Sequence, residues 1–146
     1  MTSSTESFLT AEDENEIIQA IIEAESNTSG EIRVHIEKHS HLDVLERAKQ
    51  VFFDLGMDKT DARNGVLFYV GVSDKNFALL GDVGIDKVVE GTFWDSTKNI
   101  VISHFKQQQY KQGLIEGILQ AGIRLKQFFP LLESDANELP NEISKG

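Results

Sequence analysis

The run Gly-Val-Leu-Phe-Tyr-Val-Gly-Val at residues 65–72 constrains the fold more than any other part of the sequence, because it is apolar at nearly every position. A strand with one face in water alternates apolar and polar residues, whereas a strand buried on both faces does not. The run therefore predicts an inner strand of a sheet that is covered by helices on both sides.

The segments on either side of this run predict how the sheet is connected. Residues 31–38, Glu-Ile-Arg-Val-His-Ile-Glu-Lys, alternate strictly between polar and apolar, as a strand does. Asp43 is the predicted N-cap of a helix that ends at Gly56, which makes a strand-helix-strand unit with parallel strands and a right-handed crossover. Polar residues at 73–76 predict a tight turn, so a strand over 77–81 should return antiparallel.

Three further helices are expected on the faces of this sheet. The first follows Thr10 and ends near residues 27–30, the second spans about 92–107, and the last spans about 111–129 and stops at Pro130. We therefore predict an α/β fold, a Rossmann-like three-layer α/β/α sandwich with a small mixed sheet and about four helices.

Domain limits follow from the same patterns. One domain is predicted over residues 10–130, preceded by a flexible N-terminus at 1–9 and followed by an acidic, flexible C-terminal tail at 131–146. The tail contains Pro140 and has little apolar surface to bury.

Composition excludes several classes of function. The 146-residue chain has 24 acidic and 14 basic side chains, and its formal net charge of −10 disfavours nucleic acid and anionic membranes but favours divalent cations. Cysteine is absent, so disulfides and thiolate sites do not arise. The sequence shows no signal peptide and no run of about 18 apolar residues, which predicts a cytoplasmic protein without a membrane span.

The predicted sheet brings distant polar residues to one edge. With two parallel strands and an antiparallel third, the start of the first, the start of the second and the end of the third meet there. The residues that gather at this edge are Glu31, Asp61, Arg63, Asn64, Asp82 and Asp86. Carboxylate and amide oxygens are ligands for Ca²⁺ or Mg²⁺. Glu31, Asp61, Asn64, Asp82 and Asp86 are therefore candidate metal ligands, and Arg63 is a candidate phosphate-binding residue.

A simpler interpretation of the same residues is local turn chemistry. Asp and Asn commonly cap helices and turns, Gly65 and Gly84 suit tight turns, and Glu31 with Arg63 would form an ordinary ion pair. More specific motifs fail. An EF-hand loop beginning at Asp82 would need a glutamate where Phe93 stands, and there is no P-loop, dinucleotide-binding fingerprint or nucleophile elbow.

Several short motifs together resemble the TPM domain family over roughly residues 10–130. They are Thr-Ser-Gly-Glu-Ile-Arg-Val-His at 28–35, Arg-Asn-Gly-Val-Leu at 63–67, Gly-Asp-Val-Gly-Ile at 81–85, Trp94, and the segment from Gly113-Leu114 to Phe129-Pro130. The family is similar to a thylakoid-lumen protein described as an acid phosphatase and to proteins of photosystem repair. The resemblance implies an α/β/α sandwich, and it implies calcium binding or weak phosphatase activity.

The positions that match the family are Glu31, Arg63, Asn64, Asp82 and Gly84, which places either property at the edge around Asp82. Many members carry a signal peptide and a membrane anchor, and this sequence shows neither.

Three hypotheses about function remain open at the level of sequence. The first is a Ca²⁺-binding domain, with Mg²⁺ as the other candidate ion, which contacts a partner protein when the ion orders its loops. The second is a metal-assisted acid phosphatase that hydrolyses phosphomonoesters, in which Arg63 steadies the phosphate and no catalytic acid or base is assigned. The third is a protein-interaction scaffold without a ligand.

Overall fold

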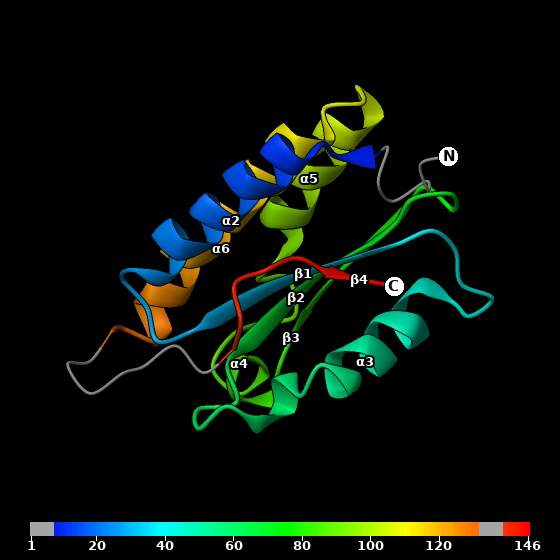
Figure 1. Ribbon diagram of the computed structural model, residues 1–146. Helices are drawn as coiled ribbons and strands as arrows, with labels where there is room; N and C mark the ends of the chain where they lie inside the picture. The colour runs from blue at the N-terminus through cyan, green and yellow to red at the C-terminus, as the bar shows by residue number, and fades with distance from the viewer. Residues whose placement is uncertain (1–7, 132–138) are drawn as a thin grey trace.

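The computed structural model describes residues 8–131 and 139–146. A four-stranded sheet of order β3-β2-β1-β4 forms the middle layer. Figure 1 shows α2, α5 and α6 on one face of this sheet and α3 on the other. This arrangement confirms the predicted three-layer α/β/α sandwich with a mixed sheet.

The secondary-structure elements follow one another in the predicted order. In chain order they are α2 (Ala11–Glu25), β1 (Glu31–Glu37), α3 (Val44–Asp54), the short 3-10 helix η1 (Met57–Lys59), β2 (Gly65–Gly71), β3 (Asn76–Gly81), α4 (Val83–Asp86), α5 (Asp95–Lys106), α6 (Tyr110–Phe128) and β4 (Ser144–Lys145). α4 is the helical turn that follows Asp82, and β4 was not predicted.

Local capping explains where the first two long helices begin. The Thr10 side chain accepts a hydrogen bond from the Asp13 N–H, and the Asp13 side chain accepts one from the Thr10 N–H, which is a capping box. The Asp43 carboxylate accepts the Leu45 N–H at 3.1 Å and caps α3. Both helix starts are those that the sequence predicts.

Strand pairing confirms the predicted directions. β1 and β2 are parallel, with Glu31 opposite Gly65, and β2 and β3 are antiparallel, with Val66 opposite Gly81. The start of β1, the start of β2 and the end of β3 therefore share one edge of the sheet.

Alternation along β1 divides the core into two layers. Ile32, Val34 and Ile36 pack in one apolar cluster with residues of α2 and α6, while the apolar residues on the other face, such as Leu67, cluster with α3. The alternate β1 residues Arg33, His35 and Glu37 are also buried, so the polar side of this strand does not face water.

Glycines in α6 permit close helix packing, as their cost within a helix suggests. A Cβ at Gly117 would lie 2.5 Å from Cγ2 of Val101 in α5, and one at Gly122 would lie 2.7 Å from the Ala24 carbonyl oxygen in α2. Both contacts bring α6 against its two neighbours.

The two ends of the chain differ from the predicted flexible segments wherever the structure describes them. Leu9 is buried in the core, and Leu139 packs in the cluster on the α3 face. β4 pairs in parallel with β1, and the Gly146 N–H donates to the Ile36 carbonyl at 3.0 Å. Backbone pairing with a sheet edge holds these last residues, which composition alone does not reveal. Residues 1–7 and 132–138 lie outside the described residues.

Within the described residues, none of the helices combines the length and apolar character required to cross a membrane.

Candidate functional site

The predicted polar edge forms where three strands begin or end. The Glu31 N–H at the start of β1 donates to the Asn64 carbonyl at 3.3 Å, and the Asp82 N–H after β3 donates to the Gly65 carbonyl at 3.0 Å. These bonds extend the sheet ladders by one step and bring the loop before β2 beside α4. We call the segments 60–64 and 82–86, with Glu31, the acidic edge.

An ion pair between Arg63 and Asp82 occupies the centre of the acidic edge. Arg63 Nε and Nη2 donate to the two oxygens of Asp82 at 2.7 and 2.9 Å. The Asp82 side chain is 4% exposed and also accepts the Val83 N–H at 2.7 Å, whereas the Arg63 side chain is 40% exposed. The pairing raises the pKa of Arg63. Asp82 is therefore an N-cap and a bidentate partner of Arg63.

Segment 60–64 docks tightly on α4 through Gly84. The Gly84 N–H donates to the Arg63 carbonyl at 2.8 Å, and a Cβ at Gly84 would lie 2.1 Å from the Ala62 carbonyl oxygen. Arg63 itself has φ of 52°, a left-handed conformation that costs a residue with a side chain roughly 1–3 kcal/mol. The site thus holds a strained backbone and a glycine that no other residue can replace without movement.

Asn64 faces inward instead of toward the ion pair. It is 1% exposed, its N–H donates to Thr60 Oγ1 at 3.3 Å, and its side-chain amide donates to Ser29 Oγ at 3.3 Å. These bonds assign Asn64 a role in fastening the loop to the start of β1.

Glu31 lies at the predicted edge, but its side chain is buried and its Oε1 accepts the Leu139 N–H at 2.6 Å. Asp61 is exposed on the loop before β2, and Asp86 is exposed at the end of α4. The fold therefore joins Arg63 directly to Asp82 and places Asp61 and Asp86 in the same two segments, 60–64 and 82–86. The side chains of Glu31 and Asn64 have other partners.

A carboxyl group that the sequence did not single out lies beside Glu31 at the start of β1. Glu25, at the end of α2, accepts the Ile32 N–H on Oε2 at 2.8 Å. Burial raises the pKa of Glu25 to about 7, opposed by that hydrogen bond and assisted by repulsion from Glu31. Helical periodicity places Glu25 only at a helix end, so no sequence signal linked it to Glu31.

The described part of the chain contains no group of three or more His, Asp or Glu side chains arranged to hold a metal ion. Any cation at the acidic edge would therefore need backbone carbonyls and water among its ligands, in addition to carboxylates.

A second polar cluster lies buried on the α3 face. Arg47 of α3 donates to Glu37 of β1 through Nε and Nη2, both at 2.8 Å. The Tyr69 hydroxyl also donates to Glu37, and His35 Nε2 lies 3.0 Å from its Oε1. His35 Nδ1 lies 3.0 Å from Ser144 Oγ of β4, which ties the C-terminal strand to the cluster. We call these five residues the Glu37 cluster.

The Glu37 cluster is charged at its centre. Burial opposes ionisation of Glu37, but hydrogen bonds from Arg47, Tyr69 and His35 outweigh it and lower the pKa to about 2. Burial lowers the pKa of His35 and raises that of Tyr69. A neutral His35 then donates from Nε2 to Glu37 and accepts from Ser144. In the sequence, the only sign of this cluster is the polar face that alternation along residues 31–38 predicts. Alternation does not show that α3 and β4 bury that face.

These features define an α/β/α domain with an acidic loop edge. A family model, the TPM domain, matches residues 3–123, and the chain belongs to that family. No curated protein matches it in sequence.

Solved structures share the fold. The chain is 55% identical to the BA42 protein from the psychrophilic bacterium Bizionia argentinensis, with a TM-score of 0.91 over 95% of this chain and 96% of that one. The N-terminal domain of a P. gingivalis protein is 17% identical, with a TM-score of 0.66 over 84% of this chain and 79% of that one. The N-terminal domain of cg2496 from Corynebacterium glutamicum is 12% identical, with a TM-score of 0.63 over 94% and 80%. The last two similarities concern the fold alone.

Proposed function

We propose that this TPM domain binds a divalent cation, Ca²⁺ in preference to Mg²⁺, at the acidic edge between segments 60–64 and 82–86. The ligands would be the carboxylates of Asp61, Asp82 and Asp86, together with backbone carbonyls and water. Binding would order the two loops for contact with a partner protein.

The observation that carries this proposal is the docking of segment 60–64 on α4 through Gly84. It places the carbonyls of Ala62 and Arg63 against the turn that begins with Asp82. Carbonyl and carboxylate oxygens together are the hard donors that Ca²⁺ accepts in irregular arrangements, whereas Mg²⁺ requires a near-ideal octahedron.

Arg63 acts in this proposal as an internal competitor of the ion. Its guanidinium already neutralises Asp82 through two hydrogen bonds, so a cation must displace it to use the carboxylate. The Arg63 side chain is 40% exposed, so the released guanidinium can be hydrated. Because an ion pair must break first, we expect weak binding, with a Kd of about 10⁻⁴ to 10⁻³ M.

Phosphomonoester hydrolysis is the second candidate, and it would require the same residues to perform additional roles. It needs the bound ion and also a free cation to hold the phosphate, and Arg63 would have to leave Asp82 for that purpose as well. Binding of an ion alone needs fewer changes, so we place it first.

A Ca²⁺ titration followed by amide NMR tests the proposal. We expect saturable shifts at Asn64, Asp82 and Asp86, loss of these shifts in Asp82→Asn, and tighter binding in Arg63→Gln, because the competing guanidinium is gone. Glu46→Gln, an exposed residue in the first turn of α3 at the other end of the sheet, serves as the control and should bind as the unchanged protein does.

Two results would contradict the proposal. Unmoved signals at Asn64, Asp82 and Asp86 at millimolar Ca²⁺ would exclude the site. Equal turnover of a model phosphoester by the unchanged protein and Asp82→Ala would separately exclude hydrolysis at this edge.

A further inference from the structure

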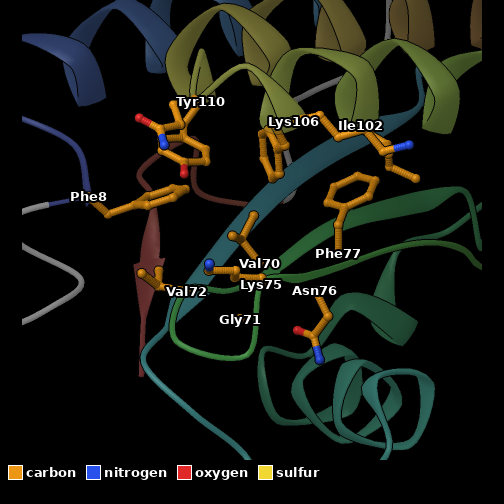
Figure 2. Close-up of a pocket in the computed structure, with 12 residues that line it drawn as sticks. Phe8, Val70, Gly71, Val72, Lys75, Asn76, Phe77, Ile102, Lys106 and Tyr110 are labelled. Carbon is orange, nitrogen blue, oxygen red and sulfur yellow. The ribbon is translucent and has the colours of Figure 1, made fainter.

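A pocket of about 450 Å³ opens at the other end of the sheet from the acidic edge. Figure 2 shows it between the end of α5 and the start of α6 on one side and the β2–β3 turn on the other. Its lining comes from segments 70–77 and 102–110, with Phe8 before α2. It shares no residue with segments 60–64 and 82–86, so what it binds is independent of the cation proposal.

The apolar wall of this pocket is built mainly from aromatic rings. Phe105 packs edge-on against Phe77 and Tyr110, with centroids 5.8 and 5.3 Å apart, and Phe8 lies 4.4 Å from Tyr110. Figure 2 shows Phe8 and Tyr110 on one side of the space and Phe77 on the other. Ring edges arranged around an open volume favour an aromatic guest, since edge-to-face pairs add about 0.5–1.5 kcal/mol to burial.

The polar part of the lining is positively charged. Lys75 in the turn and Lys106 at the end of α5 line the pocket with Asn76 and Gln108, and none of the lining residues from the described part of the chain is acidic. Within the described residues, neither lysine forms an ion pair with a carboxylate. In a chain with a net charge of −10, two such lysines beside an aromatic cavity favour a guest with one anionic group.

Backbone conformation at the pocket is an independent observation. Lys75 and Gln108 have φ of 52° and 61°, and with Arg63 they are the non-glycine residues of the described chain in the left-handed region. After α5, the Gln108 N–H donates to the Phe105 carbonyl and the Gln109 N–H donates to the His104 carbonyl, at 3.0 and 2.9 Å. This is a Schellman motif, in which glycine normally occupies the position of Gln108. Two side chains that line the pocket therefore stand where glycine would be less strained.

We propose that this pocket binds a small aromatic carboxylate. The ring lies among Phe8, Phe77 and Phe105, and the carboxylate is held at the rim by Lys75, whose side chain lies beside Val72, whereas that of Lys106 extends toward Ile102 (Figure 2). Lys75 and Gln108 occupy left-handed positions where glycine would be more stable, and we attribute their side chains to this binding function.

Amide NMR with 2-naphthoate and its neutral analogue 2-naphthylmethanol tests the proposal on the full chain. We expect saturable shifts over residues 70–77 and 102–110 with 2-naphthoate. Affinity for the alcohol should be about threefold lower, since it lacks the contact with the Lys75 ammonium group.

Variants separate the pocket from general effects on the fold. Ile102→Trp fills the pocket from the exposed face of α5 and should weaken 2-naphthoate binding at least about tenfold, whereas Ile123→Trp, on exposed α6 surface, should not. Lys75→Gln should weaken binding by about threefold, and Lys49→Gln on α3 should have no effect.

Lys75→Gly separates a binding role from a structural one, because a residue that only stabilised the fold would lower Tm when replaced. This variant should raise Tm by about 2 to 4 °C because strain is relieved, while binding weakens.

Three results would overturn the proposal. They are equal affinity for the acid and the alcohol, no saturable shift with either probe, and equal weakening by Lys49→Gln and Lys75→Gln. The second result would leave the cavity as part of a contact with another protein.

Discussion

Two arginine–carboxylate pairs lie on opposite sides of this domain, and they have similar geometry but different surroundings. Arg63 donates to the two oxygens of Asp82 at 2.7 and 2.9 Å. Arg47 donates to the two oxygens of Glu37 from Nε and Nη2, both at 2.8 Å. The Asp82 pair stands on two loops beside a strained backbone and has an arginine that is 40% exposed. The Glu37 pair joins a strand to a helix and has further hydrogen bonds from Tyr69 and His35.

The difference teaches that bidentate geometry alone does not assign a role. Glu37 is buried and its two oxygens accept hydrogen bonds from Arg47, Tyr69 and His35, so a change of partner would leave several of these groups unsatisfied. We therefore assign the Glu37 cluster to stability of the fold. Asp82 has an exposed partner on a strained residue, and this partner is the one that an ion could replace. Burial affects two carboxyl groups of β1 and its neighbour α2 differently, since hydrogen bonds lower the pKa of Glu37 to about 2 while desolvation raises that of Glu25 to about 7.

The largest effect is expected from Glu37→Gln. Removing the charge leaves Arg47 without its charged partner and weakens the four hydrogen bonds to Glu37, so the free energy of unfolding should fall by about 3 kcal/mol at pH 7. Urea unfolding measures this loss. Because the folded pKa of Glu37 lies below its ordinary value of 4.5, its contribution is present above pH 4.5 and disappears as the pH falls toward 2.

Glu46→Gln, an exposed residue on the same helix as Arg47, is the control and should change little. A similar midpoint for Glu37→Gln and Glu46→Gln would mean that the Glu37 cluster does not stabilise the fold.

Glu25→Gln should have an intermediate effect of opposite sign. The folded pKa of Glu25 is raised from 4.5 to about 7, so its favourable contribution is complete below pH 4.5 and is lost as the pH rises through 7. Glutamine keeps an acceptor for the Ile32 N–H but carries no charge. After allowance for solvent screening, the variant should be more stable than the unchanged protein by about 2 kcal/mol at pH 8 and equal to it at pH 4.

Thermal unfolding across pH 4 to 8 checks this difference, with the exposed Glu23→Gln on the same helix as the control. A constant offset at every pH would show that Glu25 does not titrate in this range.

The smallest loss of stability is expected from Asp82→Asn. Asparagine still caps α4 through its side-chain oxygen, and the released Arg63 can turn to solvent because it is already partly exposed. The urea midpoint should therefore shift by less than half of the shift in Glu37→Gln. An equal or larger shift would remove the contrast between the two pairs and would assign Asp82 mainly to the fold.

Most of the fold could be predicted from the sequence because its signals are local. The apolar run at 65–72, the alternation at 31–38 and the caps at Thr10 and Asp43 depend on periodicity and short-range hydrogen bonds, and all of them are confirmed. Strand β4 could not be predicted because two residues carry no periodicity, and its pairing with β1 depends on a sheet edge formed far earlier in the chain.

The candidate site was predicted only as far as strand direction allows. Parallel and antiparallel pairing brought Arg63 and Asp82 to the same edge, but direction does not decide where a side chain turns. The side chain of Asn64 bonds to Ser29, and that of Glu31 bonds to the Leu139 N–H. Glu25, from the end of α2, lies beside Glu31 and accepts the Ile32 N–H. The pocket between α5 and the β2–β3 turn depends on packing between segments with no shared motif.

By itself the sequence determined the order of the elements, the sheet covered on both faces and the gathering of acidic residues at one edge, because these follow from local periodicity and chain direction. Only the tertiary structure decided that Asp82 is held by an exposed arginine while Glu37 is enclosed by Arg47, Tyr69 and His35. The physical reason is that the pKa and the freedom of a carboxylate depend on desolvation and on hydrogen-bond partners, which are supplied by residues distant in the chain.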